Sequence, residues 1–230
     1  MDPLSKTLQG LYAARFAGTA DYRNSVWRVL CTDFFSAFIT ERSTVLDLGA
    51  GWGEFINNIP ADHKIAMDLN PDTGALLAPG IRLIQQDCSV RWPVNDNALD
   101  VVFTSNFLEH LTDKASIQRT IAEAYRCLKD NGAIICLGPN IKYLPGEYWD
   151  FWDHQVPLTD KSCCELLQIE GFHIERSIPR FLPYSMSSSG RPPLFLVKWY
   201  CNLPVLWPLF GKQFLIVAKK GPAAERSIRS

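Results

Sequence analysis

The sequence predicts a single α/β domain built around a doubly wound sheet. Three observations favour this fold class. Short apolar runs end in an acidic residue at Asp47, Asp68 and Asp87, so the same unit returns at intervals of roughly twenty residues. A glycine-rich turn follows the first of these runs and leads into a helical pattern. The length of 230 residues is sufficient for one domain with a sizeable core.

The composition excludes several classes of protein. The formal net charge of -1 provides no basic surface for nucleic acid, so no nucleic-acid partner is expected. The seven cysteines form no C-x-x-C pair, and we interpret them as reduced thiols of a cytoplasmic protein. No apolar segment typical of a signal peptide follows the N-terminus, and no apolar run is long enough to span a bilayer.

Residues 1–42 are predicted to form a helical cap. Apolar residues recur at three- and four-residue spacing from Val26 to Phe38, after an N-cap predicted at Asp21. Helices that bury one side have this spacing. We therefore expect two helices packed over an edge of the sheet.

The stretch from Val45 to Phe55 is the clearest candidate for a ligand-binding loop. An apolar strand contains Asp47 near its end, and three alternating glycines follow. A phosphate-binding P-loop would continue with lysine, but Glu54 follows Gly53. The dinucleotide fingerprint requires a glycine where Glu54 stands, and a carboxylate there would repel a pyrophosphate. Asp47 instead suits a ligand with a positive charge, such as the ammonium group of an amino acid.

The same stretch resembles the first motif of the class I S-adenosylmethionine (SAM) dependent methyltransferases, in the small-molecule group that includes the methyltransferase type 11 and ubiquinone-biosynthesis-like proteins. That motif reads hydrophobic, hydrophobic, Asp, hydrophobic, Gly-x-Gly-x-Gly. The resemblance implies a Rossmann-like sheet of seven strands, the last one antiparallel, and SAM as the cofactor. It also implies that Asp47, Gly49 and Gly51 surround the methionine end of SAM.

The next two strands carry candidate contacts to the rest of SAM. A strand predicted at residues 64–67 ends before Asp68 and its neighbour Leu69, at the distance from the glycine loop that suits an acid bound to ribose. The alternative is an aspartate that caps the following helix. A third strand leads to Asp87 and Cys88, and the resemblance implies that the Asp87 carboxylate and the Cys88 backbone N–H contact adenine. The alternative for Asp87 is a turn carboxylate.

The fourth strand, predicted at residues 99–104, ends at a second group of candidates. The segment 105–111 resembles the fourth-strand motif of the family, which implies that Asn106 lies where open α/β sheets bind ligands. A helix is expected over residues 112–128, and the turn at 130–132 is expected to end it before the fifth strand.

The loop at residues 143–154 is the candidate acceptor site, because loops at this edge of the sheet carry substrate contacts. Its aromatic residues are predicted to touch the acceptor: Tyr148, Trp149 and Trp152. His154 is the first candidate for a general base and His110 the second, although each could instead orient the loop or bind the backbone. No set of histidines and acids has metal-ligand spacing, so no metal is predicted.

The C-terminal part of the chain contains a segment that departs from the α/β pattern. Thr159 is expected to cap a helix that ends before Gly171, and the strand at 172–175 follows. Between the core sheet, predicted over 43–178, and the last strand lies an apolar insertion. We expect this insertion to be a lid or a homodimer surface rather than a membrane-binding surface, because it has few basic residues. Its predicted range is 179–212, the last strand is predicted at 213–219, and residues 221–230 are interpreted as a disordered tail.

The resemblance also implies that the N-terminal cap completes the cofactor pocket. Arg15, Tyr22 and Arg23 could then meet the carboxylate of SAM. We favour solvated helix charges as the interpretation of these residues.

The sequence therefore predicts a methyltransferase that acts on an oxygen or nitrogen atom of a small biosynthetic acceptor, a sugar or a natural product, by in-line displacement. The alternative is a SAM-binding protein that does not methylate, either a partner subunit or an enzyme that assists a rearrangement or cyclisation. Glu54 and Asp47 oppose a third interpretation, an NAD oxidoreductase.

Overall fold

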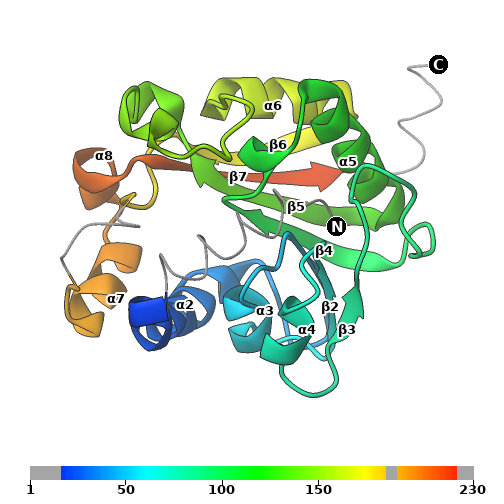
Figure 1. The fold of residues 1–230 in the computed structure, drawn as a ribbon, viewed down its shortest axis with the longest axis horizontal. Coiled ribbons are helices and arrows are strands. Elements are labelled where there is room, and N and C mark those ends of the chain that lie inside the picture. The colour runs from blue at the N-terminus through cyan, green and yellow to red at the C-terminus, as the bar shows by residue number, and fades with distance from the viewer. Residues whose placement is uncertain (1–16, 185–190, 222–230) are drawn as a thin grey trace.

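The computed structural model describes residues 17–184 and 191–221, and they form a seven-stranded sheet with helices on both faces (Figure 1). The strand order is β3-β2-β1-β4-β5-β7-β6. Strands β1 to β5 pair in parallel, and β7 is antiparallel to both of its neighbours. The strands are β1 (Thr44–Leu48), β2 (His63–Met67), β3 (Arg82–Ile84), β4 (Leu99–Ser105), β5 (Leu128–Pro139), β6 (Phe172–Ile178) and β7 (Gln213–Lys220).

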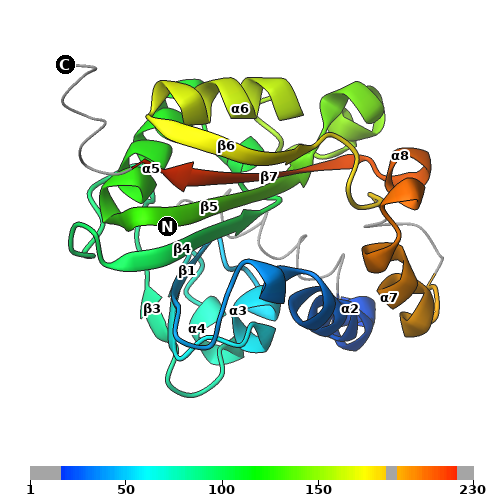
Figure 2. The ribbon, with the colours of Figure 1, turned by 180° about the vertical axis from the view of Figure 1, so that it is seen from behind.

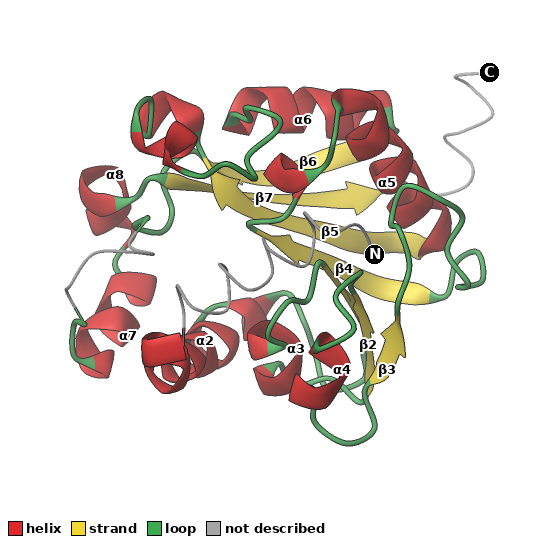
Figure 3. Cartoon of the chain, viewed as in Figure 1, coloured by secondary structure: helices red, strands yellow, loops and turns green. Residues whose placement is uncertain are grey.

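This topology confirms the predicted fold class, including the antiparallel last strand. Its central strands are apolar on both faces because helices cover both. Figure 3 shows the helices on either side of the sheet. They are α2 (Ala20–Asp33), α3 (Glu54–Asn58), α4 (Thr73–Leu76), α5 (Lys114–Cys127), α6 (Asp160–Ile169), α7 (Leu194–Asn202) and α8 (Trp207–Phe210). Short 3-10 turns lie at η1 (Ala17–Thr19), η2 (Phe35–Ala37), η3 (Leu108–His110), η4 (Ile141–Tyr143), η5 (Glu147–Asp150) and η6 (Pro204–Leu206).

The two faces of the sheet have separate cores. On one face, Leu46 and Val102 pack with apolar residues of α5 and α6. On the other, Val45 and Phe103 pack with residues of α2 and α3. Alternation of buried side chains along a strand explains why neighbouring residues join different cores.

Several predicted boundaries differ from the structure. Helix α2 begins at Ala20 rather than after Asp21, and its N-cap residue Thr19 forms no side-chain cap hydrogen bond. Helix α5 ends at Cys127, and the turn at 130–132 lies inside β5. The β4–β5 pairing changes register near this turn, and Asn131 has a φ of 64°. Asparagine and glycine in the left-handed region occur at helix ends and at strand bulges alike, so the sequence alone did not separate the two.

Other local predictions are confirmed. Thr159 forms a capping box with Ser162 at the start of α6, and β6 follows directly after Gly171. Of the two helices expected in the N-terminal cap, α2 is present. Residues 1–16, which include Arg15, and the predicted tail at 222–230 lie outside the described residues.

In the predicted insertion, helix α7 packs beside α2 (Figure 2). The ring of Phe181 lies 4.5 Å from that of Phe34, the residue that follows α2, and 5.1 Å from that of Trp207 in α8. The Tyr22 hydroxyl donates a hydrogen bond of 2.7 Å to the Pro192 carbonyl. The part of the chain that the structure describes contains no helix with the length and apolar character of a membrane span.

Candidate cofactor and acceptor site

The glycine loop after β1 adopts a conformation that only glycine readily permits. Gly49, Gly51 and Gly53 have φ values of 73°, 51° and 71°, in the left-handed region. A Cβ atom at Gly49 would lie 2.2 Å from the ring of Phe107, whereas one at Gly51 would meet nothing within 4 Å. The first glycine is therefore needed for close packing, and the second borders open space in which a ligand could approach the backbone.

Asp68 connects this loop to the end of β2. One carboxylate oxygen accepts a 2.7 Å hydrogen bond from Gly51 N–H, and the other accepts a 2.8 Å bond from Asn70 N–H. The helix cap considered for Asp68 is absent in the described residues, because Asp72 occupies the N-cap position of α4. A carboxylate has about four acceptor positions, so Asp68 retains capacity for ligand hydroxyls. Leu69, beside it, is exposed.

Asp47 is an acid buried inside the end of β1, with 3% of its surface exposed. Burial raises the pKa of this carboxyl well above its usual value, the Asp68 carboxylate raises it further, and a hydrogen bond from the Ile56 backbone opposes both effects. No lysine or arginine among the described residues forms an ion pair with Asp47. A buried carboxylate without a cation is suited to a cationic group supplied by a ligand.

Asp87 and Cys88 form the turn after β3. The Asp87 carboxylate accepts a hydrogen bond of 2.7 Å from Ser89 N–H, as the turn interpretation expected, and this bond leaves other acceptor positions. The Cys88 thiol is buried, and burial raises its pKa to about 11. Within the described part of the chain, the Cys88 backbone N–H donates no hydrogen bond to the backbone of another residue, so it could bind a ligand.

Asn106 lies at the carboxyl end of β4 with a φ of 47°. Its side-chain N–H₂ donates to the Ser105 hydroxyl at 3.1 Å. Its side-chain oxygen is buried and has no partner among the described residues. The Thr104 hydroxyl, which was not a candidate from the sequence, is also buried and has no hydrogen-bond partner among the described residues. Buried polar atoms normally find partners, so these two indicate contact with a water or a ligand.

The predicted aromatic contacts separate into two groups. Trp149 and Trp152 are 52% and 79% exposed, so both are accessible to an acceptor. Tyr148 has no exposed surface, and its hydroxyl donates to the Val156 carbonyl. In this conformation Tyr148 holds the loop together, because its ring lies 4.6 Å from that of His154.

The two candidate histidines lie next to each other. The ring centroids of His110 and His154 are 4.9 Å apart. The Glu109 carbonyl accepts hydrogen bonds from Gln155 N–H and Val156 N–H at 2.8 and 3.1 Å, which joins the acceptor loop to η3. The tertiary fold therefore brings together the two residues that sequence analysis proposed separately.

Glu109 completes this group and was missed in the sequence. Its side chain is 1% exposed, and one carboxylate oxygen lies 4.0 Å from His110 Nε2. Burial raises the pKa of Glu109, and His110 opposes the shift. The ligand atoms of Glu109, His110 and His154 lie within 4.8 Å of one another, a grouping that could hold a metal ion. The prediction of no metal relied on sequence spacing, which does not detect ligands from distant segments.

Arg23 differs from its favoured interpretation as a solvated charge. Its side chain is 18% exposed and forms a 2.7 Å ion pair with Glu54, in the first turn of α3. The guanidinium also lies 5.4 Å from the ring of Trp52. Burial raises the pKa of Glu54, and Arg23 opposes this shift. The pair therefore links the N-terminal helix to the glycine loop.

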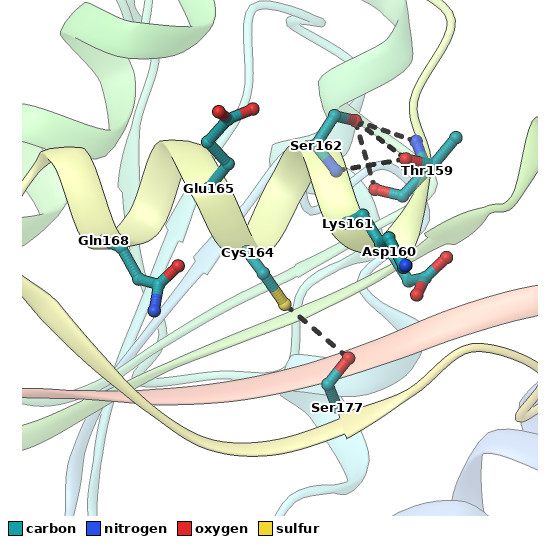
Figure 4. A pocket seen from close by; sticks show the side chains of 8 residues that line it. All are labelled: Thr159, Asp160, Lys161, Ser162, Cys164, Glu165, Gln168 and Ser177. Atoms are coloured by element: carbon teal, nitrogen blue, oxygen red, sulfur yellow. Dashed lines mark hydrogen bonds between the residues drawn. The ribbon is translucent and has the colours of Figure 1, made fainter.

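A separate hollow of about 780 Å³ lies between α6 and β6 (Figure 4). Its lining includes Cys164 and Ser177, whose side chains are 3.6 Å apart. Strand β6 forms the edge of the sheet opposite β3. This hollow is therefore remote from the glycine loop and carries none of the predicted site residues.

Comparisons with known proteins find similar sequences and similar folds. An uncharacterized methyltransferase-like protein of Schizosaccharomyces pombe is 29% identical over 137 residues, which are 56% of this chain and 46% of that protein. The chain thus spans about half the length of this curated relative.

Solved structures share the fold at low sequence identity. A Haloferax volcanii protein assigned as a methyltransferase, in complex with the Trm112 methyltransferase activator, has a TM-score of 0.66 and 16% identity, with 94% of this chain and 98% of that chain covered. The cyclase SpnF has a TM-score of 0.58 and 16% identity, with 84% and 80% covered.

A family model matches part of the chain. Residues 46–136, from β1 through most of β5, match the family model described as a methyltransferase domain. Over residues 46–136 this chain is therefore similar in sequence to the methyltransferase domain family, and it shares its fold with solved structures of proteins assigned as methyltransferases.

Proposed function

We propose that this protein transfers the methyl group of SAM to an oxygen or nitrogen atom of a small biosynthetic acceptor. One observation carries the proposal: Asp87, Asp68, Asp47 and Asn106 stand at the carboxyl ends of four strands that are neighbours in the order β3-β2-β1-β4. Ligands of open α/β sheets bind at this edge. The four residues could contact adenine, ribose, the methionine ammonium group and the methionine end next to the acceptor, in that order.

The residues of the loop would mainly orient the reactants. SAM, when bound, supplies a methyl group on a positively charged sulfonium that is already activated for displacement. The acceptor atom donates its electron pair to the methyl carbon, and the electrons of the broken bond stay on sulfur. Alignment of this kind contributes up to about 7–11 kcal/mol in favourable cases. Gly49 and Phe107 pack together and would set the position of the methionine end.

A hydroxyl acceptor must also lose its proton. His154 and His110 remain the candidates for the general base, because a histidine titrates near neutral pH. The adjacent rings support a role for both. Conversion of His154 to asparagine should lower turnover and leave SAM affinity unchanged if it acts in this way.

The acceptor would contact the loop at 143–154. Exposed Trp149 and Trp152 offer apolar surfaces that suit either a sugar face or an apolar natural product. A homodimer through the outer face of α7 stays a prediction. The exposed Phe195 and Trp199 on that helix support it.

The second candidate function is SAM binding without methylation. The similarity to SpnF, a cyclase, supports only the point that this fold also occurs in a protein that carries out a different reaction. At 16% identity this similarity does not extend to the chemistry.

The test combines binding with product analysis. Calorimetry with SAM and NADH should give binding of SAM alone. Mass spectrometry with a panel of hydroxylated and amino acceptors should reveal demethylated cofactor together with a methylated product. SAM binding without demethylated cofactor across the panel would favour the second candidate, and NADH binding without SAM binding would overturn both.

A further inference from the structure

We infer that Glu109, His110 and His154 form a binding site for a divalent transition-metal cation of the Zn²⁺ class. Their potential ligand atoms all lie within 4.8 Å of one another. Two imidazoles and one carboxylate are a donor set found in catalytic zinc sites. The inference concerns this chain's own residues and does not depend on the proposed methyl transfer.

The Glu109 carboxylate is a buried group that needs a positive partner. Only 1% of its surface is exposed. No lysine or arginine of the described segments forms an ion pair with it, and its one ion-pair contact is His110 at 4.0 Å. Buried carboxylates are normally paired with a cation or coordinate a metal. A metal ion bound between the Glu109 carboxylate and the two imidazoles would provide this positive partner.

His110 is oriented as a metal ligand would be. Its Nδ1 lies 3.0 Å from the Asp153 carbonyl oxygen and 3.4 Å from an Asp153 carboxylate oxygen. Because a carbonyl oxygen only accepts, this contact places a proton on Nδ1, and in the neutral ring Nε2 then carries the lone pair, 4.0 Å from a Glu109 carboxylate oxygen. Metal-binding histidines almost always donate their second ring N–H to a carbonyl or carboxylate in this way.

The spacing leaves room for an ion. The 4.0 Å between His110 Nε2 and the Glu109 oxygen exceeds hydrogen-bond distance. Ligand atoms about 2.0–2.2 Å from a Zn²⁺ ion stand roughly 3.3 Å apart in a tetrahedral site. Small side-chain rotations would close the three groups around the ion.

The loop that supplies His154 is held against η3, which makes the site part of the fold. The Glu109 carbonyl accepts two backbone hydrogen bonds from Gln155 and Val156, just after His154. The rings of Tyr148 and Phe151 lie 4.6 and 5.1 Å from His154 and enclose it. Ligands on a fixed backbone lose little freedom when they bind an ion.

The donor atoms also select the kind of cation. Imidazole nitrogens suit Zn²⁺, Fe²⁺ and similar ions, whereas Mg²⁺ and Ca²⁺ prefer oxygen ligands. Three protein ligands leave a tetrahedral position open to a water or an acceptor oxygen. Phe107, two residues before Glu109, packs against Gly49 of the cofactor loop, so η3 lies beside that loop.

An ion at this position would change the role assigned to the histidines. The ion would supply Lewis-acid chemistry, which would make an acceptor hydroxyl beside it more acidic. His110 and His154 would then serve as ligands rather than as bases.

The test is metal titration of the full chain after removal of bound metal with a chelator. Calorimetry follows Zn²⁺ and Mg²⁺, and visible absorption follows Co²⁺, whose bands report the coordinating atoms. Glu109→Gln and His110→Asn each remove one ligand, and the first is nearly isosteric. His63→Asn, at an exposed histidine of β2, and Cys164→Ser, at the one cysteine that is not buried, are matched controls.

The wild-type chain and both controls should bind one equivalent of Zn²⁺ and prefer it to Mg²⁺. Each ligand variant should lose about 100-fold or more in affinity while its Tm and SAM affinity stay near wild type. Absence of binding by the wild type, or unchanged affinity in both ligand variants, would overturn the inference. A chain that methylates without binding metal contradicts only this inference, and one that binds metal without methylating contradicts only the proposed function.

Discussion

At the scale of single residues, the site depends on acids in different environments. Asp47 is buried, whereas Asp68 bonds two backbone N–H groups of the glycine loop and the β2 turn. The first would pair with a charge, and the second would order the loop and bind hydroxyls.

Asp68→Asn should weaken SAM binding by about 10- to 100-fold, because charge-assisted hydrogen bonds contribute about 1.5–3 kcal/mol. Calorimetry measures the change. Asp72→Asn is the matched control, since this exposed aspartate forms no side-chain cap hydrogen bond. Equal affinity in wild type and Asp68→Asn would remove Asp68 from the cofactor site.

Asp47 should make stability depend on pH. Its pKa is raised in the folded chain, so the folded state retains a proton that the unfolded state has lost. The free energy of unfolding therefore falls as pH rises from the usual aspartate pKa through the raised one. Asp47→Asn should raise the Tm of the ligand-free chain at neutral pH, by roughly 2–4 °C for each kcal/mol of burial cost removed.

The same substitution should weaken SAM binding, because the ammonium group loses its partner. Thermal unfolding across pH, with calorimetry beside it, measures both effects. The Tm advantage of the variant should disappear toward the usual aspartate pKa, and an advantage independent of pH would contradict the assignment.

Gly49→Ala and Gly51→Ala form a second informative pair. Both would place a side chain at positive φ, which costs about 1–2 kcal/mol. Only Gly49→Ala also meets the Phe107 ring, and such overpacking costs typically about 1–3 kcal/mol more. Denaturant unfolding should therefore rank Gly49→Ala as the less stable variant. Equal stability would mean that Phe107 moves away freely.

At the scale of elements, the segment 179–212 combines a buried and an exposed face. Phe181 has no exposed surface and packs against Phe34 and Trp207. Phe195 on α7 is 58% exposed. The segment is thus anchored to α2 by one face, and the other face remains available for contact.

Phe181→Ala should lower the free energy of unfolding by about 3–5 kcal/mol, as for other buried phenylalanines. Phe195→Ala should change the stability of the isolated chain by less than about 0.5 kcal/mol. Chemical denaturation measures both. A small effect of Phe181→Ala would mean that this segment folds apart from the core.

At the scale of the whole molecule, SAM binding should stabilise the fold, because the proposed contacts would join the ends of four strands. A ligand at 100 times its Kd adds about 2.7 kcal/mol to the free energy of unfolding. For a chain of this size that corresponds to a Tm rise of roughly 5–11 °C. Thermal shift assays should show this rise with SAM and none with NADH, and the opposite pattern would contradict SAM as the cofactor of this chain.

Much of the fold, and the placement of the candidate cofactor residues at strand ends, could be predicted from local sequence. Asp47, Asp68 and Asp87 each follow a short apolar strand, so the strand itself delivers the acid to one edge of the sheet. The helix end predicted at 130–132 was wrong, because the same residue types also form the irregular start of β5. The local sequence indicates a turn at these residues, but pairing with β4 makes it an irregularity within β5 rather than the end of a helix.

The sequence by itself determined the sheet, the glycine loop and the acids that suit SAM, since these depend on contacts between near neighbours and on strand order. Only the tertiary structure decided that Glu109 joins His110 and His154, that Arg23 pairs with Glu54, and that Tyr148 is buried. The physical reason is that these contacts join segments far apart in the chain. Their distances depend on how loops pack, and no local pattern of residue types encodes that packing.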